Sequence, residues 1–137
     1  MDFNPNQARE SIMSHYMHPQ NKDSNLNEYQ TFFSTSCSDT LKIQLTWEGE
    51  VLNDAKFDGN GCAPFVAATD MFLNLVKNKT KTEIKELATL FSNFVKGQQL
   101  NESELQKIKN LWVFYNIKSQ PNRISCSLLI TQVFDDV

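Results

Sequence analysis

In this 137-residue chain, the residues best suited to bind a metal or to react are the three cysteines, Cys37, Cys62 and Cys126. Asp39 lies two residues after Cys37, so both side chains could reach one point from the same loop. Three thiolates and a carboxylate make a four-ligand set acceptable to Zn²⁺, and a sulfur-rich set also suits iron–sulfur chemistry. The ligands are spread over about ninety residues without a Cys-x-x-Cys pair. Spacing alone therefore leaves open both a shared metal site and three unrelated cysteines.

Cys62 stands in the most distinctive stretch of the chain, Phe-Asp-Gly-Asn-Gly-Cys-Ala over residues 57–63. Gly59 and Gly61 permit backbone angles forbidden to other residues, and they let neighbouring groups approach closely. An apolar, helix-prone segment follows from residue 63 to 76, which places Cys62 at a helix N-terminus. Free N–H groups and the helix dipole stabilise a thiolate there. The competing interpretation is a small buried hydrophobe, a role that free cysteine often takes.

Composition limits the class of protein. The net charge is −3, and 40% of the residues are hydrophobic. Because no stretch concentrates basic residues on one face, nucleic acid and anionic membrane are not expected as main partners. The polar first residues do not resemble a signal peptide, and no apolar run is long enough to span a bilayer. We therefore expect one domain over residues 1–137, located in the cytoplasm.

Hydrophobic periodicity predicts a helix at the N-terminus, over residues 6–17, and then a sheet. Alternation of apolar and polar residues is clear over 41–47, and two flanking segments, 29–34 and 51–57, also read as strands. Short turns between successive strands favour an antiparallel arrangement with one covered face.

The remaining sequence has helical periodicity. Capping-box spacing marks two helix starts, Thr80 with Glu83 and Asn101 with Glu104, and Gly97 is a natural stop for the first of these helices. The predicted helices cover residues 62–77, 80–96, 101–115 and 125–134. The fold class is α+β, a three-stranded antiparallel sheet with helices packed on one face.

Four motifs together resemble one family, the U-type iron–sulfur assembly proteins (IscU, SufU and the N-terminal domain of NifU). The resemblance covers nearly the whole chain, and the second cysteine motif is the most specific match. The motifs are His15-Tyr16-x-x-Pro19-x-Asn21, Cys37-Ser38-Asp39, Phe57-x-Gly59-x-Gly61-Cys62-Ala63 and Arg123-Ile124-Ser125-Cys126-Ser127-Leu128.

The chain is most similar to the SufU-like branch of this family. Ser125 stands where the IscU branch has a histidine before the third cysteine, and Arg123 stands where the SufU branch has an arginine. Residues 101–115 fit the extra segment of SufU-like proteins. The chain departs from the family where a serine-rich segment is replaced by residues 64–70, and where Ser38 follows Cys37 in place of glycine.

The resemblance implies a zinc ion held by Cys37, Asp39, Cys62 and Cys126, or alternatively an iron–sulfur cluster on the three cysteines. It also implies a partner, a SufS-like pyridoxal-phosphate cysteine desulfurase, and downstream iron–sulfur assembly or acceptor proteins. The chain would be no classical enzyme, but at most a zinc-dependent sulfurtransferase that acts with the desulfurase. Cys37 is the expected sulfur acceptor, because a loop ligand can leave a site more easily than one fixed on a helix, and Arg123 would support transfer. A scaffold for cluster assembly and a purely structural zinc domain remain as alternatives.

Overall fold

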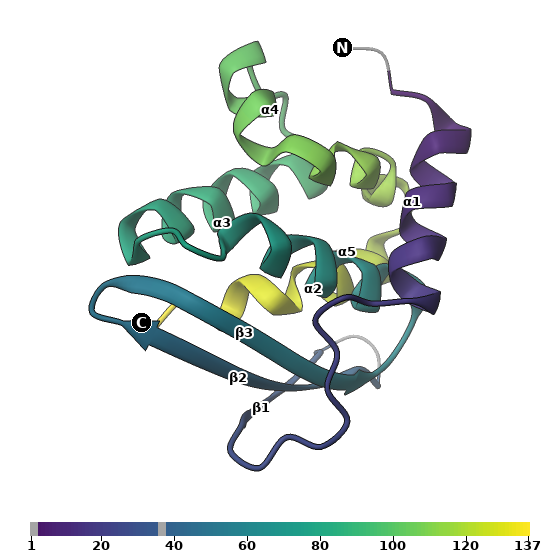
Figure 1. Ribbon diagram of the computed structural model, residues 1–137. Helices are drawn as coiled ribbons and strands as arrows, with labels where there is room; N and C mark the ends of the chain where they lie inside the picture. The colour runs from purple at the N-terminus through teal and green to yellow at the C-terminus, as the bar shows by residue number, and fades with distance from the viewer. Residues whose placement is uncertain (1–2, 36–37) are drawn as a thin grey trace.

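The structure is a computed structural model that describes residues 3–35 and 38–137. Helix α1, Pro5–Met17, is followed by strands β1, Gln30–Phe33, β2, Thr40–Glu48, and β3, Val51–Asn60. The second half of the chain is helical, and its helices lie on one side of the sheet (Figure 1). They are α2, Ala63–Val76, α3, Lys81–Val95, α4, Glu102–Ile108, and α5, Pro121–Gln132, with 3₁₀ turns η1, Lys109–Phe114, and η2, Ile117–Ser119, before α5. The predicted fold class is confirmed.

The sheet is an antiparallel meander in the order β1-β2-β3. The predicted alternation in β2 is confirmed, because Leu41 and Ile43 are buried toward the helices. Strand β3 is longer than predicted. It continues through Gly59, which pairs with Leu41, as far as Asn60, which pairs with Thr40. The strand therefore ends two residues before Cys62 and includes Gly59.

Helix α2 is the centre of the core. It packs against α1 and α5, and most of its side chains are buried, as expected for an element covered on all sides. Phenylalanines from different elements meet there: Phe72 of α2 lies 5.9 Å, between ring centroids, from both Phe91 of α3 and Phe134. These rings form part of the hydrophobic core.

Both predicted capping boxes are confirmed. The Thr80 side chain accepts the Glu83 N–H at 3.2 Å, and the Glu83 carboxylate accepts the Thr80 N–H at 3.1 Å. Asn101 and Glu104 make the equivalent pair of bonds. In both cases the side chains satisfy N–H groups that lack a partner within the helix. Gly97, with φ of +99°, ends α3 as predicted.

Two helix boundaries differ from the prediction. The expected helix over 101–115 is broken at Lys109, whose φ of +47° lies in the left-handed region and ends α4. The 3₁₀ turn that follows lets Trp112 and Tyr115 stack on Phe3, at centroid distances of 5.7 and 5.0 Å. Helix α5 begins four residues early, because Pro121 has the fixed φ that suits a first helical position.

Among the residues that the structure describes, no helix has the length and apolar character needed to cross a membrane.

Candidate metal centre

Three of the four proposed ligands meet at one end of the sheet. One ligand atom each from Asp39, Cys62 and Cys126 lie within 4.8 Å of one another, although the residues come from three different segments of the chain. Asp39 immediately precedes β2, Cys62 follows β3, and Cys126 lies on α5. Asp39 and Cys126 are buried and Cys62 is partly exposed. The fourth proposed ligand, Cys37, lies outside the described residues.

Cys62 is the N-cap of α2, as predicted. Its N–H donates a hydrogen bond to Asp39 Oδ1 at 3.2 Å, and its Sγ lies 4.0 Å from Asp39 Oδ2. No acidic side chain occupies the first turn of α2, so the positive end of the helix dipole faces Cys62 without competition from its own helix. The thiol of Cys62 and the carboxylate of Asp39 therefore lie side by side at the N-terminus of α2.

Gly61 is required at this site for close approach. A Cβ atom at residue 61 would overlap the carboxylate of Asp39 and would lie 2.5 Å from Cδ2 of Phe65. At Gly59 a Cβ atom would lie 2.7 Å from the carbonyl oxygen of Thr40. Neither glycine has a positive φ. Glycine is therefore needed at residues 59 and 61 because neighbouring groups pack closely there, and not because the backbone has unusual angles.

Cys126 is the sixth residue of α5 and fully buried, whereas the sequence placed it in the first turn. The early start of α5 at Pro121 accounts for the difference. Its Sγ lies 3.3 Å from the carbonyl oxygen of Asn122, one turn earlier in the helix. Cys126 is thus presented from the side of a helix, and Cys62 from the end of one.

The donor set fits Zn²⁺. Ligands at 2.0–2.3 Å in a tetrahedral site lie about 3.5 Å apart, so the three donors at up to 4.8 Å need to close by about 1 Å. Sulfur with one carboxylate oxygen is a donor combination that zinc accepts, and the site leaves room for one further ligand. The fourth proposed ligand, Cys37, lies two residues before Asp39 in the sequence.

The two other residues singled out near the third cysteine lie on α5. Arg123 occupies the first turn, three residues before Cys126, and is partly exposed. Ser125 is also partly exposed. Both histidines lie in the N-terminal segment, at His15 and His18, and the acid–thiol group of Asp39, Cys62 and Cys126 includes neither of them.

Helix α2 carries a buried acid, Asp70, which the sequence analysis did not identify as structural. Asp70 is completely buried, and its Oδ1 accepts hydrogen bonds from the backbone N–H and the side-chain amide of Asn21, at 2.8 and 2.9 Å. His15 Nδ1 lies 2.6 Å from Asp70 Oδ2. Asn21 bonds in turn to Asn74 and to Lys77. The signal was present in the sequence, as an acid inside an apolar helix and as the departure from the family pattern over residues 64–70.

Comparisons with known proteins identify the family of this chain. Residues 7–91 match the model of the NifU-like N-terminal domain. The chain is 30% identical to the zinc-dependent sulfurtransferase SufU of Bacillus subtilis, over 94% of this chain and 89% of that protein. It is 27% identical to the iron–sulfur cluster assembly scaffold protein IscU of Escherichia coli, over 88% of this chain and 82% of the relative.

Solved structures share the fold. A crystal structure described as an iron–sulfur cluster assembly scaffold protein for the SUF system, from Fervidobacterium islandicum, superposes with a TM-score of 0.80 and 27% identity. The alignment covers 93% of both chains. The match over residues 7–91 and the similarity to SufU over nearly the full chain confirm the resemblance seen in the motifs, and the chain belongs to the family of NifU-like N-terminal domains.

Proposed function

We propose that this protein serves iron–sulfur cluster assembly in the cytoplasm as a zinc-dependent acceptor that relays persulfide sulfur from a cysteine desulfurase. The observation that supports this proposal most strongly is the convergence of Asp39, Cys62 and Cys126 at the N-terminus of α2. The similarity to a zinc-dependent sulfurtransferase over nearly the whole chain supports the same function.

In this proposal Cys37, Asp39, Cys62 and Cys126 hold one Zn²⁺. The ion would keep the thiolates ionised at neutral pH and protected from oxidation. Asp39 supplies the oxygen ligand and orients the Cys62 backbone through its 3.2 Å hydrogen bond. Cys62 and Cys126 are fixed by helices, so Cys37 is the ligand best able to move toward a donor. Arg123, at the exposed start of α5, would bind a carboxylate of the desulfurase.

The transfer step conserves atoms and electrons. The Cys37 thiolate attacks the outer sulfur of the enzyme's cysteine persulfide, and a new S–S bond forms while the enzyme's own S–S bond breaks. The enzyme's cysteine leaves as a thiolate, and Cys37 now carries the persulfide with its proton. The two reactants are one persulfide and one thiolate, and so are the two products. The step therefore needs no oxidant or reductant.

The second candidate function is a scaffold on which an iron–sulfur cluster is assembled and transferred. It is favoured by the 27% identity to the assembly scaffold IscU of Escherichia coli. In that case Cys37, Cys62 and Cys126 would bind the cluster as cargo, and Asp39 would complete the coordination. Sulfur-rich sites of this kind suit both a zinc ion and an iron–sulfur cluster.

Desulfurase turnover tests the proposal. The protein loaded with zinc should raise the turnover of the cysteine desulfurase of the same organism several-fold, and removal of zinc with a chelator should abolish the effect. Cys37→Ser, Cys62→Ser and Cys126→Ser should each abolish it too. Full stimulation by metal-free protein would reject the relay in favour of the scaffold.

A further inference from the structure

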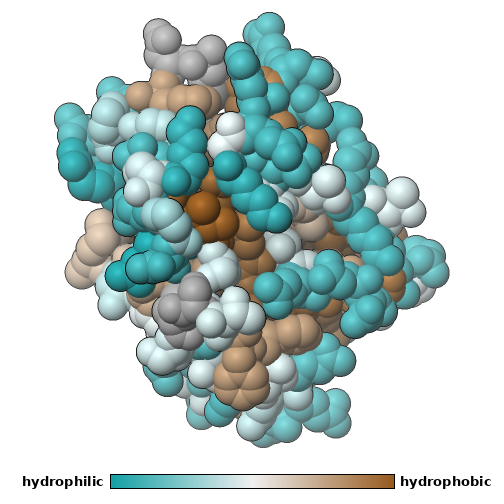
Figure 2. Space-filling view, turned by 180° about the vertical axis from the view of Figure 1, so that it is seen from behind, coloured by the Kyte–Doolittle hydropathy of each residue, from teal (hydrophilic) through white to brown (hydrophobic). Residues whose placement is uncertain are grey.

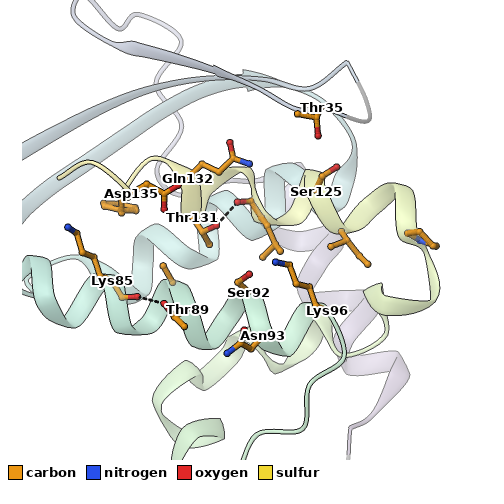
Figure 3. A pocket seen from close by; sticks show the side chains of 15 residues that line it. Thr35, Lys85, Thr89, Ser92, Asn93, Lys96, Ser125, Thr131, Gln132 and Asp135 are labelled. Carbon is orange, nitrogen blue, oxygen red and sulfur yellow. Dashed lines mark hydrogen bonds between the residues drawn. The ribbon is translucent and has the colours of Figure 1, made fainter.

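A groove lies between α3 and α5 at the surface of the molecule. Its volume is about 790 Å³. In Figure 3, side chains of α3 form one wall and side chains of α5 form the other, with Thr35 above the end near Ser125. On the face shown in Figure 2, apolar atoms are exposed at the bottom of a hollow that hydrophilic side chains surround. A groove of this volume can hold a peptide segment as well as a small organic molecule.

One end of the groove borders the candidate metal centre. Ser125, which lines the groove, is the neighbour of Cys126 in α5. Thr35, at the same end, lies two residues before Cys37 in the sequence. A protein that brings a persulfide to these cysteines has to cover the surface next to them. The groove is therefore continuous with the surface that a sulfur donor must contact.

The lining of the groove combines apolar residues with two lysines, one acid, Asp135, and several neutral polar side chains. Of the apolar residues, Leu128 and Phe134 are almost fully buried and Ile124 is partly exposed. Lys85 and Lys96, both exposed, line the α3 wall eleven residues apart, a separation of about 16 Å along a helix. Among the described residues neither lysine has an ion-pair partner. The groove thus presents two unpaired cations on a protein whose net charge is −3.

The hydroxyl groups on the walls are partly committed to their own helices. Thr89 Oγ1 donates to the Lys85 carbonyl oxygen at 3.1 Å, and Thr131 Oγ1 donates to the Leu128 carbonyl oxygen at 2.6 Å (Figure 3). An occupant would meet the apolar lining residues, the two lysines, the Asp135 carboxylate and the other polar side chains of the walls.

We propose that this groove is the docking site for an amphipathic helix of the cysteine desulfurase, with an apolar stripe on the groove base and acidic residues about three turns apart that pair with Lys85 and Lys96. This inference rests on the proposed function. A helix laid between two helices packs its ridges into their grooves at interaxial distances of about 8–10 Å. An amphipathic helix in an apolar groove is also a recurring mode of protein recognition.

The test measures two quantities with the desulfurase of the same organism: the dissociation constant by titration calorimetry, and the concentration of this protein that gives half-maximal stimulation of turnover. The double variant Lys85→Glu, Lys96→Glu should raise both at least tenfold at low salt, with maximal turnover unchanged. Raising NaCl to about 0.5 M should reduce the difference, because salt screens the exposed charge pairs.

Two further variants separate charge from shape. Lys79→Glu makes one of these charge changes on another surface, just before α3 and beside α4, and should alter both quantities less than twofold. Thr89→Trp fills the groove without a change of charge and should weaken binding at least fivefold at every salt concentration. Circular dichroism and zinc content of each variant must match those of the parent protein.

The outcomes distinguish the groove from the function. If the parent protein binds and stimulates the desulfurase while the Lys85, Lys96 and Thr89 variants do so equally well, the groove proposal is overturned and the proposed function stands. If the parent protein binds without stimulation, the function fails and the binding constants still decide the groove. If the parent protein does not bind the desulfurase, both proposals fail.

Discussion

Replacement of Gly61 by alanine is the most informative single change at the candidate metal centre. The new Cβ would lie 2.7 Å from Cγ of Asp39 and 2.5 Å from Cδ2 of Phe65, and closer still to Oδ1 of Asp39. Carbon atoms pack at about 3.5–4.0 Å, so the carboxylate has to retreat by about 1 Å. Both Phe65 and Asp39 are buried, and the closest overlap is with the Asp39 carboxylate. The strain therefore falls mainly on Asp39.

The expected cost follows from two contributions. Overpacking of a tight site costs about 1–3 kcal/mol. Displacement of the carboxylate also weakens its 3.2 Å hydrogen bond from the Cys62 N–H, and bonds to charged groups contribute about 1.5–3 kcal/mol. If about 1.4–2.8 kcal/mol of this total falls on metal coordination, zinc should bind about 10- to 100-fold more weakly.

The assay is a zinc competition titration against a chromophoric chelator. Gly59→Ala is the matched control, because its Cβ would meet Thr40 and Phe65 with no close contact to Asp39. It should lower the midpoint of thermal unfolding while zinc affinity stays within about threefold. In an Asp39→Ala background, Gly61→Ala should reduce zinc affinity much less than in the parent protein, because the two changes act on one contact. Fully additive losses would refute the assignment of Asp39 as the residue that Gly61 accommodates.

Two further predictions concern stability, measured by thermal and denaturant unfolding. Asp70→Ala removes the acceptor for the backbone N–H and one side-chain N–H of Asn21, together with the partner of His15, and should lower the free energy of unfolding by about 1–3 kcal/mol. A loss below about 1 kcal/mol would show that the buried network contributes little. Ser127→Ala, next to Cys126, should be neutral or stabilising by up to about 1 kcal/mol. The reason is that the buried Ser127 hydroxyl has no hydrogen-bond partner among the described residues. A clear loss of stability would contradict this.

Local chemical signals in the sequence predicted much of the fold. Thr80 with Glu83 and Asn101 with Glu104 specify helix starts through side-chain hydrogen bonds within four residues, and Gly97 specifies a stop. Alternation in β2 indicated its buried face correctly. Cys62 could be placed at a helix N-terminus because the change from polar to apolar sequence occurs at that residue.

Features that depend on distant contacts were not predicted. The break at Lys109 allows Trp112 and Tyr115 to stack on Phe3, about a hundred residues away in sequence. In the sequence, the apolar stripe of the predicted helix continues across Lys109 and gives no sign of this break. The extension of β3 depends on pairing with β2, which compensates for the low strand propensity of its glycine.

The candidate site shows the same limit. The types of the ligands could be read from the sequence, and the proximity of Asp39, Cys62 and Cys126 could not, since it depends on how β3, α2 and α5 pack. The reason for Gly61 also became visible only with Asp39 in place beside it.

The central claim is that this protein accepts sulfur, and mass spectrometry of its cysteines tests it most directly. Zinc-loaded protein is incubated with the cysteine desulfurase and cysteine, free persulfides are trapped by alkylation, and the peptides that contain Cys37, Cys62 and Cys126 are compared. The sulfur relay predicts one added sulfur atom on the Cys37 peptide, and none on that peptide after Cys37→Ser. An absence of added sulfur on all three cysteines, while an iron–sulfur chromophore forms on the protein when iron is supplied, would contradict it.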